Sequence, residues 1–557
     1  MKSTVKTQCV QTARVLSAHG VRHAVLCPGS RNLPLINAFA LTSEISCRSI
    51  VDERSAAFFA LGMAQNGGSP VAVVCTSGSA LLNFAPAVAE AYYKKLPLIV
   101  ISADRPQAWI DQQDSQTLRQ PGALSNIVKG TFTLPEGEAE TDLWFANRQI
   151  NEAALTALEA PAGPVHINVP LSLPLNKLRD YGAGELEALC RVIRLAPVEP
   201  VVDKEFMRQT AIKFQTTKKI LIVAGGMAPS HALTRSLARL ASRDNVVVMS
   251  ENLSNLHLPH QSRFTEALAE RLDGENTRQL QPQLLVTFGD AVVSSQLKQW
   301  LRSNPRVKEH WHVGEEPNIV DTYMCLTTKF RMSPANFFLQ LRRHMRASDT
   351  AAESNYQALF SAFRDKVEQE WNAAASSSGW CDLGALDVVV RQLPADINLQ
   401  LSNGMSVRLA MRLAATFHFH RADCNRGVSG IDGSTSTALG AATRTERTTV
   451  LVSGDMSACY DAAAFQIAPR LTRNFKMLVI ANGGGDIFRH IAQNEDPRVA
   501  NDYLTAGHAM QVDIAAMARA CGWATFEARS YDELHKNCGQ WFSRRTEPSL
   551  LICHTAT

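Results

Sequence analysis

The sequence predicts an α/β fold made of three doubly wound parallel-sheet domains. Short, wholly apolar runs recur along the chain and alternate with longer segments of helical periodicity. Such runs suit parallel strands covered by helices on both faces, and their alternation with helices is typical of doubly wound sheets. The length of 557 residues allows roughly three or four domains. We expect domains at 1–180, 200–345 and 380–557.

The N-terminal domain is expected to open on a helix, because Val5, Cys9 and Ala13 recur at helical spacing and Gly20 can end it. The Pro- and Leu-rich stretch 170–174 closes the domain. Its expected strands lie near 24–27, 71–76, 98–102 and 165–169.

A helix with one apolar face is expected from 356, and it leads into 373–379, whose Ala- and Ser-rich composition predicts a flexible linker. The C-terminal domain begins near Cys381. The expected strands of the central domain lie at 220–224, 245–250, 284–288 and 310–313, and those of the C-terminal domain include 449–453, 476–481 and 550–553.

Composition excludes several classes of protein. The chain is 45% hydrophobic and 19% charged, as a globular protein is. Its formal net charge of +4 is small for this length and no basic block appears, so we expect neither nucleic acid nor a membrane surface as a partner. No apolar stretch approaches the roughly 18–20 residues of a membrane span. The twelve cysteines are scattered without a C-x-x-C pair, which favours reduced thiols in a cytoplasmic protein.

Two polar loops follow neighbouring strands of the C-terminal domain. Asp455 stands in G-D-M after the strand at 449–453, and Asn482 stands in N-G-G after the strand at 476–481. A carboxylate, an amide and the exposed carbonyl of Gly484 are hard oxygen ligands of the kind that Mg²⁺ or Mn²⁺ binds together with phosphate. Each loop alone is simply a polar turn beside glycine, but their pairing favours a metal–diphosphate site.

This spacing resembles the motif of the thiamine-diphosphate-dependent enzymes, written G-D-G followed some two dozen residues later by N-N. Here Met456 replaces the last Gly, and Ala481-Asn482 stand for the doublet. The resemblance implies three domains. In chain order these are a domain that binds the pyrimidine of the cofactor, a central domain, and a domain that binds the diphosphate. It also implies that Glu53, between a short strand and a helix, holds the aminopyrimidine and activates the cofactor. A Glu opening a helix can otherwise serve as a cap.

The resemblance assigns thiamine diphosphate and a divalent metal as cofactors. Ile431 would wedge beneath the bound cofactor and bend it. The further cofactor-binding residues that the family implies, besides Glu53, Asp455 and Asn482, are Gly78, Asn403, Gly404, Ser429, Gly454, Met456, Ser457, Ile487 and Phe488.

Polar and arginine-bearing motifs narrow the resemblance to one branch of that family. They are P-G-S-R at 28–31, A-D-R-P at 103–106, Q-T-L-R-Q-P-G at 116–122, N-G-M-S-V-R at 403–408 and N-R-G-V-S-G-I-D-G at 425–433. The branch decarboxylates 2-oxoglutarate and adds the product to isochorismate in menaquinone biosynthesis. Arginine holds carboxylates bidentately, and both substrates are dicarboxylates. By resemblance, Arg408 would hold 2-oxoglutarate, Arg426 would lie close to both substrates, and isochorismate would be held by Ser30, Arg31, Arg105 and Gln116. The alternative is that these are surface arginines with local salt bridges.

The chain departs from that branch at four places. Ser295 and Gln296 stand where a Lys-Arg pair is common, and Gly404 stands where a Ser is usual. Ser115 stands in place of an Asn, and Asp486 replaces a residue that is usually neutral. Lys298, three residues after Ser295, can partly restore the missing charge. These departures concern the acceptor substrate more than the cofactor.

Two other functions stay open. One is a different thiamine-diphosphate enzyme, such as an acetolactate-synthase-like carboligase or a simple 2-oxoacid decarboxylase. The other is a non-catalytic nucleotide-binding protein, suggested by the glycines at 225–226, although the full G-x-G-x-x-G spacing is missing. In the family, the domains at one cofactor come from different subunits. We therefore expect a homodimer or a dimer of dimers, with Glu53 facing Asp455 of the other chain.

Overall fold

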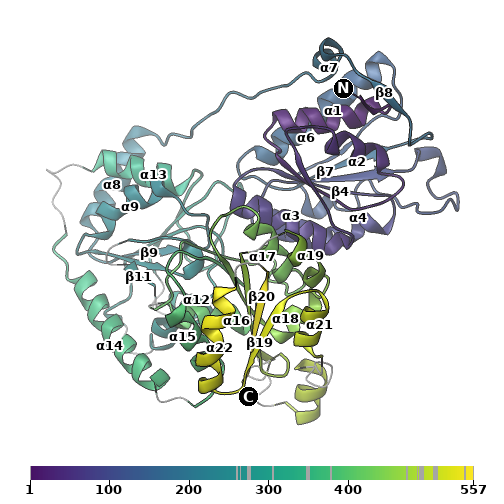
Figure 1. The fold of residues 1–557 in the computed structure, drawn as a ribbon. Helices are drawn as coiled ribbons and strands as arrows, with labels where there is room; N and C mark the ends of the chain where they lie inside the picture. Colours follow the sequence, from purple (N-terminus) through teal and green to yellow (C-terminus); the bar gives the residue numbers. More distant parts are fainter. Residues whose placement is uncertain are drawn as a thin grey trace.

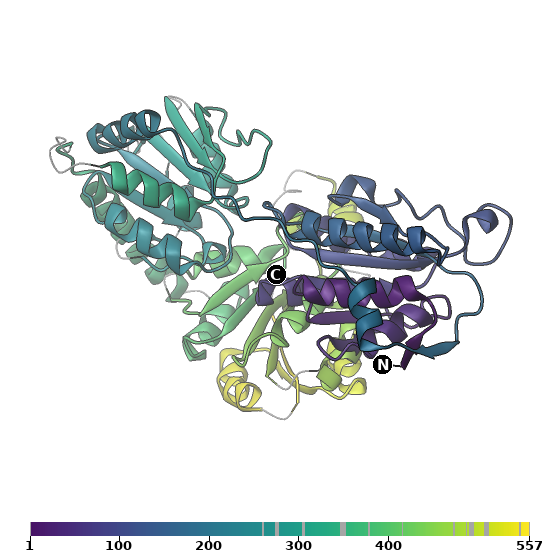
Figure 2. The same cartoon turned by 90° about the horizontal axis from the view of Figure 1, so that it is seen from above.

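The predicted α/β class is confirmed by three six-stranded sheets, each of parallel strands (Figure 1). The computed structural model describes residues 2–258, 261–263, 265–272, 278–303, 307–345, 352–376, 379–414, 416–471, 474–485, 487–488, 495–505, 512–544 and 547–555. The sheets form three lobes, which we call the first, central and third blocks in chain order (Figure 2). In the described part of the chain, no helix combines the length and apolarity needed to cross a membrane.

The first block has strand order β3-β2-β4-β5-β7-β6. Alternate residues of its central strand face opposite layers: Val71 and Val73 pack towards α3 and α5, whereas Ala72 and Val74 pack towards α1, α2 and α6. A short antiparallel pair, β1 with β8, lies beside this sheet. The strands are β1 Lys2–Thr4, β2 His23–Leu26, β3 Ser46–Ser49, β4 Val71–Cys75, β5 Leu98–Asp104, β6 Thr131–Thr133, β7 Val165–Pro170 and β8 Leu178–Asp180, and the helices are α1 Thr7–Ala18, α2 Leu33–Ala40, α3 Glu53–Gly67, α4 Ser79–Asn83, α5 Ala85–Tyr93, α6 Glu140–Leu158 and α7 Ala183–Leu189.

The central block has strand order β11-β10-β9-β12-β13-β14, and an extended segment after α7 connects it to the first block (Figure 1). Its strands are β9 Ile220–Ala224, β10 Val246–Ser250, β11 Gln261–Ser262, β12 Leu284–Phe288, β13 Glu309–Val313 and β14 Thr328–Phe330, and its helices are α8 Lys204–Thr216, α9 His231–Ala241, the 3₁₀ turn η3 Asn252–Ser254, α10 Thr265–Glu270, α12 Ser295–Arg302, α13 Pro334–His344 and α14 Tyr356–Ser376.

The third block has strand order β16-β15-β17-β18-β20-β19, which places β17 and β18 side by side in its middle. Its strands are β15 Asn398–Leu401, β16 Arg421–Cys424, β17 Thr449–Gly454, β18 Phe475–Ala481, β19 Ala524–Ala528 and β20 Ser549–His554, and its helices are α15 Asp382–Gln392, α16 Met405–Arg412, α17 Ser434–Ala442, α18 Asp455–Tyr460, α19 Ala464–Leu471, a π-helical turn Val499–Leu504, α21 Ile514–Ala520 and α22 Tyr531–Ser543.

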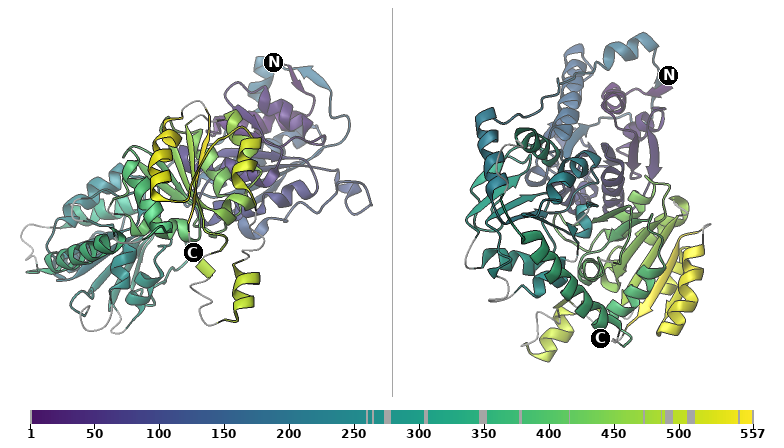
Figure 3. Two further views of the ribbon diagram at one scale, coloured as in Figure 1. Left: turned by 60° about the horizontal axis from the view of Figure 1, so that its bottom comes forward. Right: turned by 90° about the vertical axis from the view of Figure 1, so that its left-hand side faces the viewer.

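The linker expected at 373–379 is wrong over its first half, because α14 continues to Ser376. Alanine has the highest helix propensity, so an Ala-rich stretch that follows an established helix extends it. Residues 377–378 lie outside the described part of the chain. The long helix α14 runs along the outside of the central block towards the third block (Figure 3).

The first and third blocks meet where α3 crosses α17 (Figure 1). A Cβ added at Gly62 would lie 1.9 Å from the Thr437 carbonyl oxygen, and one at Gly440 would lie 1.9 Å from that of Phe59. Only glycine permits so close an approach of two helix backbones. The two blocks consequently share one apolar core around this crossing.

The central block docks on the third through the loop after β10. Asn252 donates from Nδ2 to the carbonyl oxygen of Ala410 in α16 at 2.9 Å. Asn255 donates to the carbonyl oxygen of Ala422 in β16 at 2.9 Å and accepts from its N–H at 2.8 Å. These buried amides join the loop to two elements of the third block: α16, which carries Arg408, and β16, which precedes Arg426.

Candidate active site

A cavity of about 580 Å³ lies at the carboxyl ends of β15, β17 and β18 in the third block. Ligands of doubly wound sheets bind at this edge. The recorded lining, within the described residues, comes from the third block alone and includes twelve of the predicted cofactor or metal residues together with both predicted arginines of this block. They are Asn403, Gly404, Ser429, Ile431, Gly454, Asp455, Met456, Ser457, Asn482, Gly484, Ile487, Phe488, Arg408 and Arg426.

The carboxylate of Asp455 is placed by the end of β17 and by the glycine loop after β18. Its Oδ1 accepts from the N–H of Met456 at 2.7 Å, and its Oδ2 accepts from those of Gly483 and Gly484 at 2.9 and 3.1 Å. The side chain is buried, which raises its pKa although the three amides stabilise the charge. Oδ1 accepts only one of these bonds and so keeps a lone pair for a cation.

The NH₂ group and the oxygen of the Asn482 side-chain amide point in different directions. Its Nδ2 donates to Oδ2 of Asp382 at 2.7 Å, so its Oδ1 is directed away from that carboxylate and is available as a ligand. Among the described residues, no group of three or more His, Cys, Asp or Glu side chains gathers around a potential metal position. One carboxylate, one amide and a glycine carbonyl suit Mg²⁺ when phosphate supplies further oxygens, as the predicted cofactor does. The site therefore fits a metal–diphosphate pair.

Asp382 was not predicted as a site residue. It is the first residue of α15, lies in the same cavity and also accepts a hydrogen bond from Thr555 near the C-terminus. It precedes Asn482 by 100 residues, and nothing in its neighbourhood resembles a ligand motif. An acidic residue opening a helix is common, so the local sequence gives no signal of this role.

Asn403 organises the loop that follows β16. Its Nδ2 donates to the carbonyl oxygens of Asn425 and Gly430, and its Oδ1 accepts from Nη1 of Arg426 at 3.0 Å. Within this loop Ser429 has φ +64°, a left-handed conformation that is costly for a residue other than glycine. The fold thus holds a strained loop against the cavity, and Ile431 lies on it.

Two guanidinium groups face this cavity from neighbouring elements. Arg408 of α16 donates to the carbonyl oxygen of Gly404 at 2.6 Å, and burial together with the positive charge of Arg426 lowers its pKa. The Nε of Arg426 is buried and has no hydrogen-bond partner among the described residues. Neither arginine has a recorded ion pair within the described residues. Two like charges held together in this way favour an anionic ligand.

Lys298 of α12 lies half-buried where the central block meets the third. Burial lowers its pKa, the carboxylate of Glu251 opposes that shift, and the charges of Arg426 and Arg408 reinforce it. The lysine therefore belongs to the same electrostatic environment as the two arginines. Ser295 and Gln296 are both exposed at the start of α12.

The predicted residues of the first block form a second group, outside the lining of this cavity. Arg31 donates to the carbonyl oxygen of Leu171 at 2.7 Å, and burial together with Arg105 lowers its pKa. Arg105 pairs with Asp114 at 3.2 Å. This is a local salt bridge of the kind expected if the arginine only served the surface. Gln116 has φ +56° and approaches Gly78, and Ser30 is exposed.

Glu53 is the first residue of α3, but it is not the cap of that helix. The N-cap is Asp52, whose Oδ1 accepts from the N–H of Ser55 at 2.8 Å. The next residue, Arg54, donates to the carbonyl oxygen of Tyr460 at 2.7 Å, at the far end of the helix that Asp455 begins. The start of α3 therefore lies beside α18 of the same chain, and Asp52 rather than Glu53 serves as the cap of the helix.

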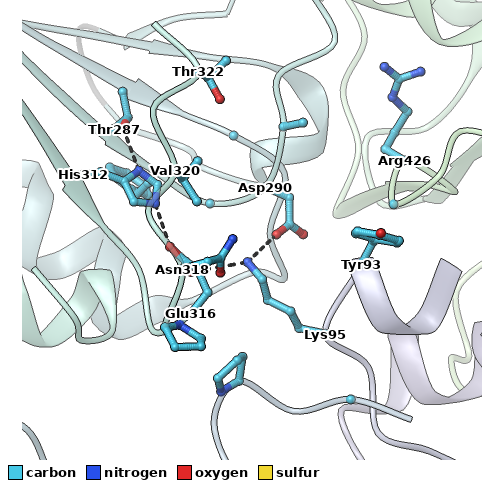
Figure 4. Close-up of a pocket in the computed structure, with 18 of the residues that line it drawn as sticks. Tyr93, Lys95, Thr287, Asp290, His312, Glu316, Asn318, Val320, Thr322 and Arg426 are labelled. Atoms are coloured by element: carbon cyan, nitrogen blue, oxygen red, sulfur yellow. Dashed lines mark hydrogen bonds and ion pairs between the residues drawn. The ribbon is translucent and has the colours of Figure 1, made fainter. Parts of the chain in front are cut away.

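A second cavity, of about 840 Å³, lies where the three blocks meet (Figure 4). Lys95 of the first block pairs there with Asp290 of the central block at 2.8 Å and with Glu316 at 3.7 Å. Hydrogen bonds from His312 and Lys329, together with Lys95, outweigh burial and hold the pKa of Glu316 well below its usual range. Arg426 of the third block lines both cavities.

Comparison with known proteins agrees with this geometry. The family model of the thiamine pyrophosphate enzyme N-terminal TPP binding domain matches residues 10–123, and that of the C-terminal TPP binding domain matches residues 403–553. The chain is 36% identical to a 2-succinyl-5-enolpyruvyl-6-hydroxy-3-cyclohexene-1-carboxylate synthase of Bacteroides thetaiotaomicron, over 93% of this chain and 89% of that protein.

Two further relatives carry the same name. The protein of Flavobacterium johnsoniae is 35% identical over 98% of this chain and 95% of its own length. That of Desulfotalea psychrophila is 39% identical over 89% of each chain. With this identity across nearly its whole length, the chain belongs to the 2-succinyl-5-enolpyruvyl-6-hydroxy-3-cyclohexene-1-carboxylate synthase family of thiamine pyrophosphate enzymes.

Proposed function

We propose that this protein decarboxylates 2-oxoglutarate and transfers the remaining four-carbon unit to isochorismate, giving 2-succinyl-5-enolpyruvyl-6-hydroxy-3-cyclohexene-1-carboxylate for menaquinone biosynthesis. The support is the identity to synthases of that name along nearly the whole chain. The structural observation that carries the proposal is the pair Arg408 and Arg426, partly buried beside the metal–diphosphate residues and facing one cavity. A 2-oxoacid with a second carboxylate is the donor that such a pair selects.

Thiamine diphosphate, when bound, supplies the electron sink that decarboxylation of a 2-oxoacid requires. Asp455, Asn482 and the Gly484 carbonyl would hold Mg²⁺ or Mn²⁺ against the diphosphate. Glu53 would hydrogen-bond the pyrimidine ring and stabilise its imino tautomer, so that the exocyclic nitrogen can accept a proton. Ile431, on the strained loop, would support the bent form of the cofactor.

Arg408 would hold the distal carboxylate of 2-oxoglutarate, and Arg426 would lie close to both substrates. Lys298 would add positive charge from the central block in place of the missing Lys-Arg pair. On the acceptor side, isochorismate would be held by Ser30, Arg31, Arg105 and Gln116. Two dicarboxylate substrates explain why a chain of net charge +4 gathers arginines here.

We further propose domain limits of 1–180, 200–345 and 380–557, each of which encloses one six-stranded sheet. A homodimer is proposed as the smallest active assembly. Its support is that the cavity holding Asp455 is lined, within the described residues, by the third block alone. A first block is then needed to bring Glu53 to the pyrimidine.

The experiment that tests the function is an incubation of the protein with 2-oxoglutarate, isochorismate, thiamine diphosphate and Mg²⁺, followed by mass spectrometry. The expected product appears only when all four are present. Replacing 2-oxoglutarate by pyruvate should give little product, because pyruvate lacks the carboxylate that Arg408 would bind. Release of CO₂ with pyruvate at a similar rate, or formation of acetolactate, would instead identify another thiamine-diphosphate enzyme.

A further inference from the structure

The last turn of α5 in the first block holds the loop that carries Arg426 in the third block. Glu90 is 1% exposed. Its Oε1 accepts from the N–H of Gly427 at 2.7 Å, and its Oε2 accepts from the N–H of Val428 at 2.8 Å. One carboxylate therefore binds two successive amides directly after Arg426. Buried hydrogen bonds to a charged acceptor are among the stronger contacts in a protein.

A second residue of the first block holds the other side of the same loop. Lys94, which follows α5 directly, donates from Nζ to the carbonyl oxygen of Cys424 at 2.8 Å. The backbone is thus held two residues before Arg426 and again one and two residues after it. A Cβ at Gly427 would lie 2.8 Å from the Glu90 carbonyl oxygen, so the loop can come this close only with glycine at that position.

The side chain of Arg426 is held from the opposite direction. Its Nη1 donates to Oδ1 of Asn403 at 3.0 Å, and its buried Nε meets no hydrogen-bond partner in the part of the chain that the structure describes. Lys95, the next residue after Lys94, pairs with Asp290 and so ties the end of α5 to the central block as well (Figure 4). The backbone that carries Arg426 is consequently held by the first block, and its guanidinium group is held by Asn403 of the third block.

We infer that Glu90 is a positioning residue, which acts on the substrates through Arg426. The inference rests on the function proposed above, in which Arg426 binds a substrate carboxylate. A guanidinium group held in its binding geometry loses less freedom when a carboxylate binds, and small displacements of such groups weaken binding strongly. Neither the lining of the cavity nor the family motifs include Glu90.

Glu90→Gln is the informative change, because it keeps the size of the side chain. An amide accepts at its oxygen only, and its NH₂ group would face the N–H of Gly427 or Val428, donor against donor. We expect the KM for 2-oxoglutarate to rise about 10-fold while kcat changes less, since the groups that activate the cofactor are untouched. The dissociation constant of glutarate, which binds like the donor but cannot react, should rise by a similar factor.

A double-mutant cycle with Arg426→Ala separates positioning from a general structural role. If Glu90 acts through Arg426, Glu90→Gln should cost about 10-fold in kcat/KM in the wild type and less than about 2-fold when Arg426 is absent. Equal losses in both backgrounds would overturn the inference. Asp321→Asn is the matched control, because Asp321 also accepts from two successive amides, those of Cys325 and Leu326, but in an exposed loop of the central block. It should leave KM unchanged.

Lys94→Met provides the same cycle from the other side of the loop, in case Glu90→Gln does not fold. Its loss of the hydrogen bond to Cys424 should also raise KM only while Arg426 is present. The melting temperature with and without thiamine diphosphate reports whether each variant folds and binds cofactor. A wild-type protein that makes no product would refute the proposed function, whereas an active wild type with an additive cycle would refute only the role of Glu90.

Discussion

Asn482 donates a hydrogen bond from Nδ2 to Oδ2 of Asp382 at 2.7 Å, across 100 residues of sequence. The carboxylate of Asp382 can accept a hydrogen bond only from the NH₂ group of Asn482. This contact therefore sets the orientation of the side-chain amide and presents its oxygen to the cavity. Burial is the main cause of the raised pKa of Asp455, and the nearby negative charge of Asp382 raises it further. A divalent cation bound at Asp455 would offset the repulsion between the two carboxylates.

Asp382→Ala should therefore weaken metal binding without removing a metal ligand. Loss of a residue that orients a ligand typically costs roughly 10- to 100-fold in metal affinity. The measurement is the Mg²⁺ concentration needed for half-maximal stabilisation by thiamine diphosphate in thermal unfolding. Asp396→Ala, which removes an exposed carboxylate paired with Arg447, is the control and should change nothing. Unaltered Mg²⁺ dependence in Asp382→Ala would show that Asn482 needs no such partner.

Glu53→Gln should bind thiamine diphosphate with nearly normal affinity but exchange the proton on the thiazolium carbon much more slowly. The amide can still hydrogen-bond the pyrimidine, yet it does not stabilise the imino tautomer as a carboxylate does. Exchange in deuterated buffer can be followed by NMR. Asp52→Ala is a useful comparison, because Asp52 caps α3 and its loss should affect stability rather than exchange. Exchange at the wild-type rate in Glu53→Gln would remove Glu53 from the mechanism.

Arg408→Ala should lower kcat/KM for 2-oxoglutarate by an amount that corresponds to roughly 2–5 kcal/mol, because a buried carboxylate would lose its charged partner. The loss should be smaller with 2-oxobutyrate, which has no distal carboxylate. Arg412→Ala is the matched control on the same helix, since Arg412 pairs with Glu270 at 2.6 Å instead of facing the cavity. An equal loss with both donors would contradict the assignment of Arg408 to the distal carboxylate.

The proposed dimer predicts complementation between inactive chains. A Glu53→Gln chain mixed with an Asp455→Ala chain should regain part of the activity if each cofactor lies between two subunits, because half of the heterodimer's sites are intact. Within one chain Arg54, next to Glu53, contacts Tyr460 of α18, so the experiment distinguishes the proposed dimer from a site built within a single chain. The measurement is activity after subunit exchange has been demonstrated. Activity that stays at the level of the single variants would place each site within one chain.

The stability of the folded protein should depend on pH because of Asp461, which is buried at the contact between the first and third blocks. Burial raises its pKa to about 7, against hydrogen bonds from Ser436 and Ser55 that favour the charge. The ordinary value is about 4. Between pH values of about 4 and 7 the folded chain thus keeps a proton that the unfolded chain has lost, so this group destabilises the fold progressively as pH rises through that window.

Asp461→Asn removes this dependence. The melting temperature of the variant minus that of the wild type should increase as pH rises from about 4 to about 7. Above that range the difference should stay constant. The comparison uses the difference between the two proteins because the other titrating groups are common to both. A difference that is the same at every pH would show that Asp461 does not titrate in this range.

Sequence alone determined the features that depend on neighbouring residues. The apolar runs at 71–76, 98–102 and 449–453 became the strands β4, β5 and β17, because a buried strand needs only a short continuous apolar segment. The loops with Asp455 and Asn482 followed from the ends of such strands. Edge strands such as β6 Thr131–Thr133 were missed, since their polar, partly exposed residues lack that pattern.

Tertiary structure alone decided the contacts between distant segments. Asp382 of α15 meets Asn482 at the end of β18, and Glu90 of α5 meets Gly427 in the loop after β16. The continuation of α14 to Ser376 likewise depended on the helix already formed before it. A carboxylate on a helix looks the same in sequence whether it faces solvent or another domain. Its role is set by which block packs against it, and that packing is a property of the whole chain.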